Sequence, residues 1–548
     1  MARRNRSDVH PIQISLLGEI NLRPYLVLAL GVLLLRLITA LPLERAGYMD
    51  ASYTQHVGGN LAQGRGFTQD IVWNYLEEPK TIPGPSNLYW LPLPSVLAGI
   101  SMTLFGVSYR AAQIPFILLS LLPPLLAFYL ARHLYARDDY AWMAGLLTAF
   151  SGFYVIYWVS PDNFTPFAVT TGFALLCLAL GVSQMQARYF FAAGVLAALS
   201  QLARADALLI LATLPILLWL HRRALAARFC GVAALAAAGG FALTLAPWLA
   251  RNYFAIGAPL APGSARTLWL LSYDEFFSYD VARLTLERYL AWGWGNILAS
   301  KFAALGFSVL VLLFGVWQIF LAPFAAVGFW KMRGRVEMQV ALIYLALLTL
   351  TMAFVFTFPA THGSMLHSAA ALVAFGAVAV PPGLDAAVAW LGKRRKRWNV
   401  AQAQKFFRWG AIALAIFFSM YLYAQGVWIP PAETATTALW NQRDIEYAAL
   451  DRELDARNVP AEVPIITVDP PSFINETGRR SIYLPTESVD AIFDAARQFG
   501  ARYLILQYDK PATLRALYEG KAAVEGLTSL ATFQDGLGRP VFLFEVTR

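Results

Sequence analysis

The chain has 548 residues, of which 58% are hydrophobic and only 14% are charged, whereas an ordinary soluble domain carries about 25% charged residues. This composition excludes a soluble globular protein and predicts a polytopic membrane protein. The net charge of +9 is distributed in short basic clusters between apolar runs, which is a positive-inside pattern and not a nucleic-acid-binding surface. The two cysteines predict neither a disulfide framework nor a metal site.

The apolar runs predict an α-helical membrane domain over residues 1–430, with about eleven spans. Basic residues precede the first span, so the N-terminus is expected in the cytoplasm. The predicted spans are 24–43, 112–131, 140–159, 164–184, the short pair 189–203 and 207–220, 229–248, 302–330, 338–357, one that starts near 366, and 409–428.

A further apolar run, Leu88 to Phe105, is also long enough to cross a membrane. If it crossed, nearly all loops rich in Lys and Arg would face outside, so we expect a juxtamembrane or re-entrant element there. Pro92 and Pro94 fit such an element because they interrupt a helix early. The outer face of the plasma or inner membrane then carries the loops 44–111 and 249–300 and the C-terminal region.

Residues 431–548 predict a small extracytoplasmic α/β domain, because the composition changes at about Pro431. Helices are expected at 433–458, 488–499 and 511–519, and strands at 464–468, 502–507, 527–533 and 540–546. Asp535-Gly536 and Gly538 separate the last two strands as in a hairpin. A Pro-Pro-Ser turn is expected after Thr467, and no catalytic constellation is visible in this domain.

Asp50 opens the most informative stretch of the first outer loop. It lies about seven residues after the last apolar residue of the first span, where a lipid headgroup would sit. Ser52 to Gln63 predict a short amphipathic helix that Gly64 ends. Asp50 is therefore either the N-cap of this helix, where Asp is favoured, or a reacting carboxylate at the membrane surface.

The predicted outer face gathers the unusual polar residues of the chain. Carboxylates and cations at one membrane face suit the transfer of a sugar from a lipid phosphate: a carboxylate accepts the proton of the attacking hydroxyl, and cations stabilise the leaving phosphate. This chemistry requires Asp50, Asp162, Lys80 and Arg204 to converge on one cavity. The full set is Asp50, Lys80, Tyr89, Asp162, Arg204, Asp206, Arg251, Arg266, His362 and His367.

Several of these residues also have a purely structural interpretation. Charged and aromatic side chains near span ends serve as interfacial anchors, and a charge inside a span needs a polar partner. The alternatives are an Arg204–Asp206 pair between two spans, Arg251 as an anchor, His362 and His367 as loop and helix-start residues, Tyr89 in the interfacial aromatic belt, and Arg36 packed against a polar group of the bundle.

Several motifs of this chain, taken in order, resemble those of the lipid-phosphate-sugar-dependent glycosyltransferases of the C superfamily. The similarity is to the branch with protein O-mannosyltransferases and the aminoarabinose transferase of lipid A, and it covers roughly the first 370 residues. Ala51 stands where many members have a second acidic residue. The motifs are Asp50-Ala51-x-Tyr53 through Gly64-Arg65-Gly66-Phe67, Glu78-Pro79-Lys80 before Leu88-Tyr89-Trp90, Leu104-Phe105-Gly106-Val107, Asp162, Ala203-Arg204-Ala205-Asp206, Pro247 to Tyr253, and Arg266 to Trp269.

The resemblance implies an inverting transfer from a polyprenyl-phosphate sugar to the hydroxyl of a protein, glycolipid or glycan acceptor. Asp50 is then the base, and Asp162 shares that role or orients the acceptor. A divalent metal ion is the one cofactor left open, because Asp50, Asp162 and His367 could gather around an ion. The expected donor-phosphate and substrate-binding residues are Lys80, Tyr89, Arg204, Asp206, Arg266 and His367.

Two other functions fit a polytopic membrane protein. A transporter or flippase of lipid-linked sugars would place polar groups near the middle of the membrane in broken helices, whereas most spans here are free of charge. A membrane anchor for the C-terminal domain would leave the polar residues of the outer face without a purpose.

Overall fold

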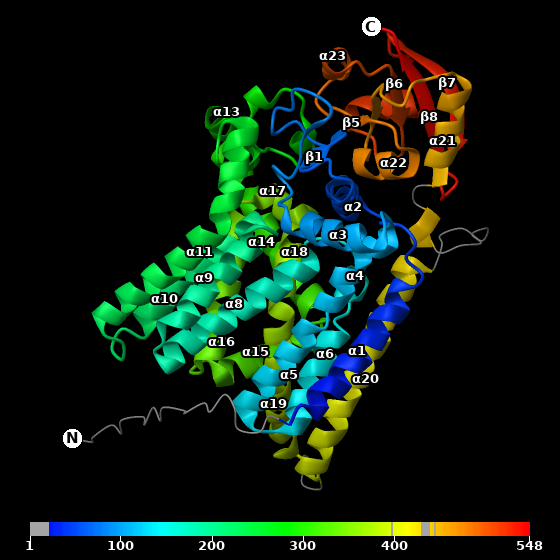
Figure 1. Cartoon of the computed structure of the whole chain (residues 1–548). Coiled ribbons are helices and arrows are strands. Elements are labelled where there is room, and N and C mark those ends of the chain that lie inside the picture. Colours follow the sequence, from blue (N-terminus) through cyan, green and yellow to red (C-terminus); the bar gives the residue numbers. More distant parts are fainter. Residues whose placement is uncertain (1–20, 396–397, 429–438, 443–444) are drawn as a thin grey trace.

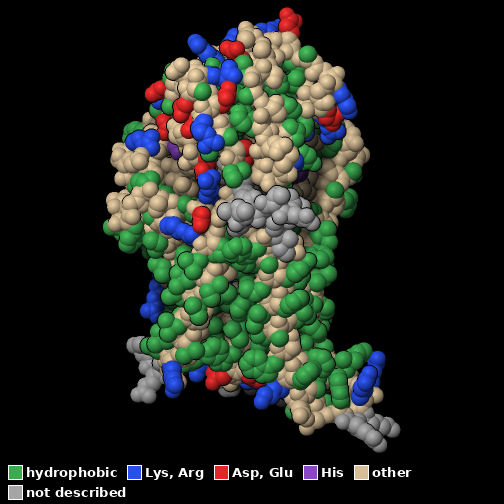
Figure 2. Space-filling view, turned by 90° about the vertical axis from the view of Figure 1, so that its right-hand side faces the viewer, with side chains coloured by type: hydrophobic (Ala, Val, Ile, Leu, Met, Phe, Trp, Pro, Cys, Tyr) green, Lys and Arg blue, Asp and Glu red, His purple; other side chains and the backbone are tan. Residues whose placement is uncertain are grey.

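The computed structural model describes residues 21–395, 398–428, 439–442 and 445–548. It consists of a helical bundle with an α/β domain at one end (Figure 1). A broad hydrophobic band covers the bundle on the face shown in Figure 2. Mostly basic residues lie at the end of the bundle away from the α/β domain, and mixed charges lie on the α/β domain. The predicted class, a multi-pass α-helical membrane protein with a C-terminal α/β domain, is confirmed.

Among the described residues, eight helical segments are long and apolar enough to cross a membrane. The other three predicted spans correspond to the shorter helices α6 (Asp138–Ala149), α9 (Ala187–Gln201) and α10 (Leu208–Leu220). The eight are α1 (Arg23–Ala40), α4–α5 (Tyr109–Leu119 and Leu122–Tyr135), α8 (Phe164–Gln184), α11 (Ala227–Ile256), α14 with the π-turn after it (Trp294–Leu310 and Val311–Val316), α16 (Val336–Phe354), the run from α17 (Thr357–Pro359) through α18 (Met365–Ala369) to α19 (Val373–Gly392), and α20 (Val400–Val427).

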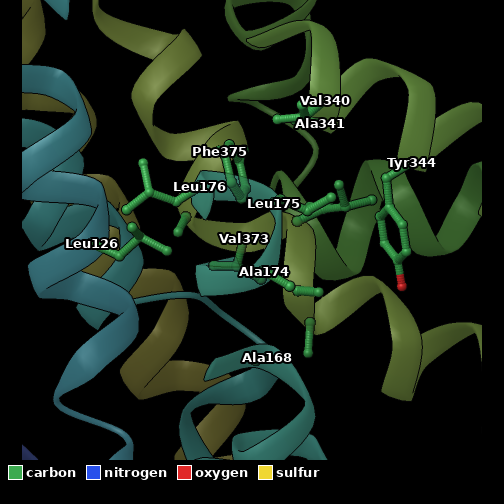
Figure 3. Close-up of a cluster of buried hydrophobic side chains, with 14 of the residues drawn as sticks. Leu126, Ala168, Ala174, Leu175, Leu176, Val340, Ala341, Tyr344, Val373 and Phe375 are labelled. Atoms are coloured by element: carbon green, nitrogen blue, oxygen red, sulfur yellow. The ribbon is translucent and has the colours of Figure 1, made fainter. Parts of the chain in front are cut away.

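The centre of the bundle is a close-packed apolar core. Figure 3 shows side chains of α5, α8, α16 and α19 meeting there, among them Leu126, Leu175, Tyr344 and Phe375. Helix α8 and the run from α17 to α19 are the most buried of these segments, and the apolar residues of α8 are buried on nearly every side. This rigid core holds the ends of α8 and α18 in fixed positions, and both ends contribute to the site described below.

Two of the predicted spans are broken. The span expected at 140–159 ends as a regular helix at Ala149, and the one expected at 302–330 is interrupted between Val316 and α15 (Ala322–Met332). The two breaks meet, since Gln318 Nε2 donates to the Phe150 carbonyl over 2.7 Å. Backbone groups freed in a membrane require such partners. The predicted end of the span 229–248 is also wrong, because α11 continues until Gly257 caps it with a positive φ.

The run Leu88 to Phe105 forms α3 (Leu93–Phe105), which at 13 residues is shorter than the roughly 20 that a span needs. It packs on α2 (Met49–Ala62), the predicted helix of the first loop. Both helices lie between the bundle and the α/β domain (Figure 1). Gly58 and Ala98 allow this approach, because a Cβ on Gly58 would lie 2.9 Å from the Ala98 Cβ.

The α/β domain contains a six-stranded sheet in the order β2-β5-β4-β6-β8-β7. The four predicted strands are present, whereas β5 and the two-residue β2 were not predicted. The strands are β2 (Ile71–Val72), β4 (Ile465–Thr467), β5 (Ser481–Tyr483), β6 (Tyr503–Leu506), β7 (Leu527–Gln534) and β8 (Pro540–Val546), and the helices are α21 (Ile445–Ala456), α22 (Pro470–Thr477), α23 (Val489–Phe499) and α24 (Arg515–Tyr518).

Two expectations for this domain need correction. The Pro-Pro-Ser segment is helix α22 and not a turn, because Asp469 caps it by accepting from Ser472 N and proline is favoured in a first helical turn. The predicted helix at 433–458 begins, within the described residues, at Ile445; 433–438 and 443–444 lie outside them.

The first loop supplies an edge strand to the C-terminal sheet. Strand β2 pairs with β5 in parallel, and Tyr75 Oη donates to the Tyr483 carbonyl over 2.5 Å. Helix α2 is held as well, because Ser52 and Ser472 share a hydrogen bond of 2.9 Å. The sheet is therefore not built from residues 431–548 alone, and the C-terminal domain is attached directly to the helix that carries Asp50.

Helices α9 and α11 approach each other through glycine. A Cβ on Gly194 would lie 2.0 Å from the Ala237 carbonyl oxygen of α11. We expect Gly194→Ala to push the helices apart and to cost about 1–3 kcal/mol of stability. The measurement is the melting temperature of purified protein in detergent. Gly231→Ala is the matched control, because no atom lies within 4 Å of its added Cβ; equal melting temperatures for both variants would contradict the expectation.

Candidate functional site

Asp50, Asp162 and His367 meet at the end of the bundle that faces the α/β domain. One oxygen of each carboxylate and one ring nitrogen all lie within 4.8 Å of one another. His367 Nε2 is 3.6 Å from Asp50 Oδ2, and His367 Nδ1 is 3.6 Å from Asp162 Oδ2. The three residues come from α2, from the turn before α8, and from α18, so the fold joins segments that are far apart in the chain.

Asp50 is the second residue of α2, and Tyr48 occupies the N-cap position without a side-chain cap. The interpretation of Asp50 as the N-cap is therefore wrong, although a carboxylate in the first turn still favours the helix dipole. Its side chain is 27% exposed and lines a cavity. Asp50 is thus the member of the cluster that a substrate can reach.

Asp162 is 2% exposed and lies behind the other two residues. Its Oδ2 accepts from Tyr48 Oη over 2.9 Å, and its Oδ1 accepts from the Asn163 backbone N–H. His367 Nδ1 is 2.6 Å from Asn163 Oδ1, so Nδ1 carries the hydrogen and the lone pair of Nε2 faces Asp50. The Phe164 ring stacks on the imidazole at 3.8 Å. The orientation of each side chain is therefore fixed by a neighbour.

The environment of the cluster favours the protonated form of its carboxyl groups. Burial raises the pKa of Asp50 well above its ordinary value, and the negative charge of Asp162 raises it further. Burial also raises the pKa of Asp162 to about 6, while the Asn163 N–H and Tyr48 Oη act in the opposite direction. Two carboxyl groups with raised pKa values beside a cavity are typical of an acid–base site.

The cavity beside Asp50, called the reaction cavity below, has a volume of about 190 Å³. Arg204 and Asp206 line it and form the predicted pair, with 3.0 Å between Arg204 Nε and Asp206 Oδ1. Arg204 also donates to Ser368 Oγ and to the Ser364 carbonyl. The remaining wall is largely aromatic: Trp73, Tyr89, Trp90, Tyr273, Phe276, Phe277 and His362.

Lys80 and Arg266 lie outside the reaction cavity. Lys80 lines an adjoining cavity of about 530 Å³, and its side chain is 80% exposed and 3.8 Å from Glu78. Arg266 is paired with Glu78 and donates to the Leu76 carbonyl. The expectation that Lys80 converges with Asp50 and Arg204 on one cavity is thus wrong. The loop after Trp73 places Lys80 in the adjoining cavity, on the other side of an aromatic wall. Trp73 and Tyr89 line both cavities.

Two other singled-out arginines have structural environments. Arg251 donates to the Phe67 carbonyl over 2.8 Å and lies over the Trp248 ring, so it anchors the first loop. Arg36 is fully buried, lies 5.9 Å from the Trp158 ring, and has no hydrogen-bond partner within the described part of the chain. Neither residue lines the reaction cavity.

Tyr48 and Asn163, which fix Asp162 and His367, were not predicted as site residues. Tyr48 lies two residues before Asp50 and Asn163 directly follows Asp162, and this proximity was the only available signal. Trp73 and Phe276 were also missed as cavity residues, because an aromatic side chain near a span end has no signature that separates a belt from a cavity wall.

Removing the charge of Asp50 tests this electrostatic description. Because the folded-state pKa of Asp50 is raised, ionising it destabilises the protein increasingly as pH rises above about 3.9. We expect Asp50→Asn to raise the melting temperature at pH 8 and to raise it less at pH 5.

Asp206→Ala is a control that should change stability in the opposite direction. It leaves the largely buried Arg204 without its carboxylate partner, so the folded protein should lose about 3 kcal/mol of stability. A lower melting temperature for Asp50→Asn at pH 8 would contradict the described repulsion.

Comparisons with known proteins agree with this architecture. Residues 86–250 match the family model described as dolichyl-phosphate-mannose-protein mannosyltransferase. The search of curated proteins gave no match. The chain is similar in structure to the Archaeoglobus fulgidus oligosaccharyltransferase AglB in complex with an inhibitory peptide and a dolichol-phosphate (TM-score 0.54, 13% identity, 89% of this chain and 70% of that chain).

A second structure of the A. fulgidus oligosaccharyltransferase, in complex with Zn and sulfate, matches with a TM-score of 0.54 and 14% identity over 88% of this chain and 67% of that chain. ArnT from Cupriavidus metallidurans, bound to undecaprenyl phosphate, matches with a TM-score of 0.49 and 13% identity over 96% and 98%. The predicted resemblance is confirmed. None of these matches is to a transporter.

Proposed function

We propose that this multi-pass membrane protein is a glycosyltransferase of the C superfamily that transfers a sugar with inversion from a polyprenyl-phosphate donor to an acceptor hydroxyl. The family match and the similarity in fold support the proposal. The observation that carries it is a carboxylate, Asp50, on a cavity that is also lined by a largely buried cation, Arg204. A carboxylate and a cation on one small cavity match the two charges that develop when a hydroxyl displaces a phosphate.

The reaction occurs at the extracytoplasmic face of the cell membrane. Basic clusters such as Lys331 to Arg335 and Lys393 to Arg395 follow helices that end away from the α/β domain (Figure 1). The positive-inside rule places those ends, and the N-terminus, in the cytoplasm. The reaction cavity and the C-terminal domain are then on the outer side.

Asp50 is the base in this mechanism. It accepts the proton of the acceptor hydroxyl while the oxygen forms a bond to the anomeric carbon and the bond from that carbon to the phosphate oxygen breaks. One displacement on one face inverts the anomeric configuration. Asp50 is preferred to Asp162 because Asp162 is buried and already accepts two hydrogen bonds. The raised pKa of Asp50 makes it a stronger base.

Asp162 and His367 position Asp50, and Arg204 stabilises the phosphate that leaves with the electron pair of the broken bond. The aromatic wall packs against the sugar ring. The adjoining cavity accommodates the lipid, because Ala255 and Ile256 at the end of α11 and Leu260 after it contribute apolar side chains to it. Lys80 lines that cavity and attracts the donor headgroup, and Arg266 acts from outside it, next to Glu78. Tyr89 separates lipid and sugar.

A divalent metal ion is the cofactor that the cluster can hold. Zinc ligands lie about 2.0–2.2 Å from the ion, so a separation of 3.6 Å between Asp50 Oδ2 and His367 Nε2 fits two ligands of one ion. The second ring nitrogen is held by Asn163 Oδ1, and a metal-bound histidine generally donates this N–H to an oxygen acceptor. Asp50, Asp162 and His367 would bind the ion, which would supply positive charge beside the leaving phosphate.

The proposed function predicts that Asp50→Asn abolishes use of a lipid-linked donor. Purified protein in nanodiscs would receive a panel of radiolabelled polyprenyl-phosphate sugars together with candidate acceptors, and the loss of label from the lipid would be followed. We expect wild type to release label from at least one donor and Asp50→Asn to be slower by about 100-fold or more.

Asp70→Asn is the matched control, because Asp70 lies in the same loop and pairs with Arg65 away from the reaction cavity. It should retain activity. Equal rates for wild type and Asp50→Asn would move the base to another carboxylate, and release from no donor by folded wild type would overturn the proposed function.

Chelation tests the metal site. We expect exhaustive treatment with a chelator to lower the rate and re-addition of a divalent ion to restore it. Metal content measured by mass spectrometry should be about one ion per chain for wild type and should fall in His367→Ala. Retention of full activity in metal-free protein would exclude a catalytic ion.

A further inference from the structure

A third cavity, of about 440 Å³, lies between the α/β domain and the residues just before Asp50. It is called the acidic cavity below. Tyr48 and Met49 form one side of it, and Met49 also lines the reaction cavity. The segment from Tyr48 to Asp50 thus has the reaction cavity on one side and the acidic cavity on the other, so a molecule bound in the acidic cavity lies next to the proposed base.

The sheet topology explains why a binding cavity forms here. Strands β4 and β6 are parallel neighbours, and the chain leaves β4 toward β5 on one side and returns to β6 on the other. In open α/β sheets, ligands bind outside the carboxyl ends of the strands at this kind of switch point. The acidic cavity occupies that position, since Asp469 follows β4 and Gln507 and Asp509 follow β6.

The lining of the acidic cavity is strongly acidic. Four carboxylates, Glu446, Asp469, Asp509 and Asp535, face one guanidinium, Arg539, which is paired with Asp535 at 2.6 Å. Such a lining attracts a group of positive charge. It also repels anions, which separates this cavity from the donor phosphate.

Glu446 supplies an independent sign of a ligand. Glu446 is only 3% exposed, and its Oε1 accepts from Gln507 Nε2 over 2.9 Å. Its Oε2 has no hydrogen-bond partner in the described part of the chain. A buried carboxylate oxygen without a partner is costly, and burial accordingly raises the pKa of Glu446 to about 7. A bound cationic donor would remove this cost.

We infer that the acidic cavity binds the acceptor, and that the acceptor is a peptide with a lysine or arginine near the hydroxyl that is glycosylated. The inference rests on the proposed function. A peptide is favoured over a lipid-anchored acceptor because every residue that lines the cavity comes from the α/β domain or from Gly47 to Met49, and none comes from a membrane span. The acceptor therefore enters from the aqueous side, opposite to the lipid-bound donor.

The test compares synthetic serine peptides that differ only in one residue near the serine: lysine, glutamine or glutamate. We expect wild type to have the lowest KM for the lysine peptide. Glu446→Gln should raise that KM by about 5- to 10-fold with little change in kcat. Its KM for the glutamine peptide should stay unchanged.

Asp509→Lys is a second variant at an exposed position, so it tests the charge without disturbing the interior. It should raise the KM of the lysine peptide and lower that of the glutamate peptide. Asp490→Lys, also exposed on this domain but outside the acidic cavity, is the matched control and should leave all three values unchanged.

The outcomes separate the inference from the function on which it rests. Loss of peptide discrimination in Glu446→Gln and Asp509→Lys, but not in Asp490→Lys, supports the acidic cavity as the acceptor site. Transfer that is equally efficient for all three peptides in wild type overturns the inference and leaves the proposed function intact. Transfer only to an amino-sugar glycan or to a lipid acceptor also overturns it.

Glu446→Gln also provides a measurement that does not depend on activity. The raised pKa means that ionised Glu446 destabilises the folded domain as pH increases from about 4.3 through 7. The variant should therefore melt at a higher temperature than wild type at pH 8 and at nearly the same temperature at pH 5. A lower melting temperature at pH 8 would mean that Glu446 has a structural role, and this would overturn the inference.

Discussion

Asp50 and Asp162 each lie 3.6 Å from one nitrogen of the same imidazole, with Asp162 almost fully buried and Asp50 on the wall of the reaction cavity. Burial raises the pKa of Asp50, and repulsion by the negative charge of Asp162 raises it further. The arrangement persists only because other contacts fix each partner. The central helix α8 holds the turn of Asp162, α18 carries His367, and the docking of α2 on the C-terminal domain fixes Asp50. The packing of the helices and of the C-terminal domain therefore holds together two carboxyl groups that repel each other.

The three cavities around this contact divide the substrates by their chemistry. The adjoining cavity has an apolar side toward α11 that suits a lipid, and the reaction cavity has an aromatic wall that suits a sugar ring. The acidic cavity suits a polar molecule of positive charge. Shared wall residues, Tyr89 on one side and Met49 on the other, connect the three. In the proposed function, this order of cavities keeps the lipid-linked donor and the aqueous acceptor apart until both reach Asp50.

Most of the membrane domain was predictable from the sequence, because span length and the distribution of Lys and Arg report directly on the bilayer. The assignment of α3 as a juxtamembrane helix followed from charge alone. The breaks near Phe150 and Gln318 were not predictable, since the bonds that compensate them join residues far apart in the chain. Asp50 and Asp162 could be identified from loop position and family motifs, but the position of Lys80 depends on how the loop after Trp73 folds. The strand β2 has only two residues, which is too few for any periodic pattern.

The pairing of β2 with β5 has a consequence for biogenesis. In the proposed topology, Ile71 is among the first outer residues to be synthesised, and its partner Ser481 is made only after every span has been inserted. Contacts between segments so distant in the chain form late in folding. Helix α2 then acquires its final attachment only when the last domain has been translocated and folded. A truncated or incompletely inserted chain would therefore contain Asp50 without the scaffold that orients it, so the proposed base reaches its final position only at the end of synthesis.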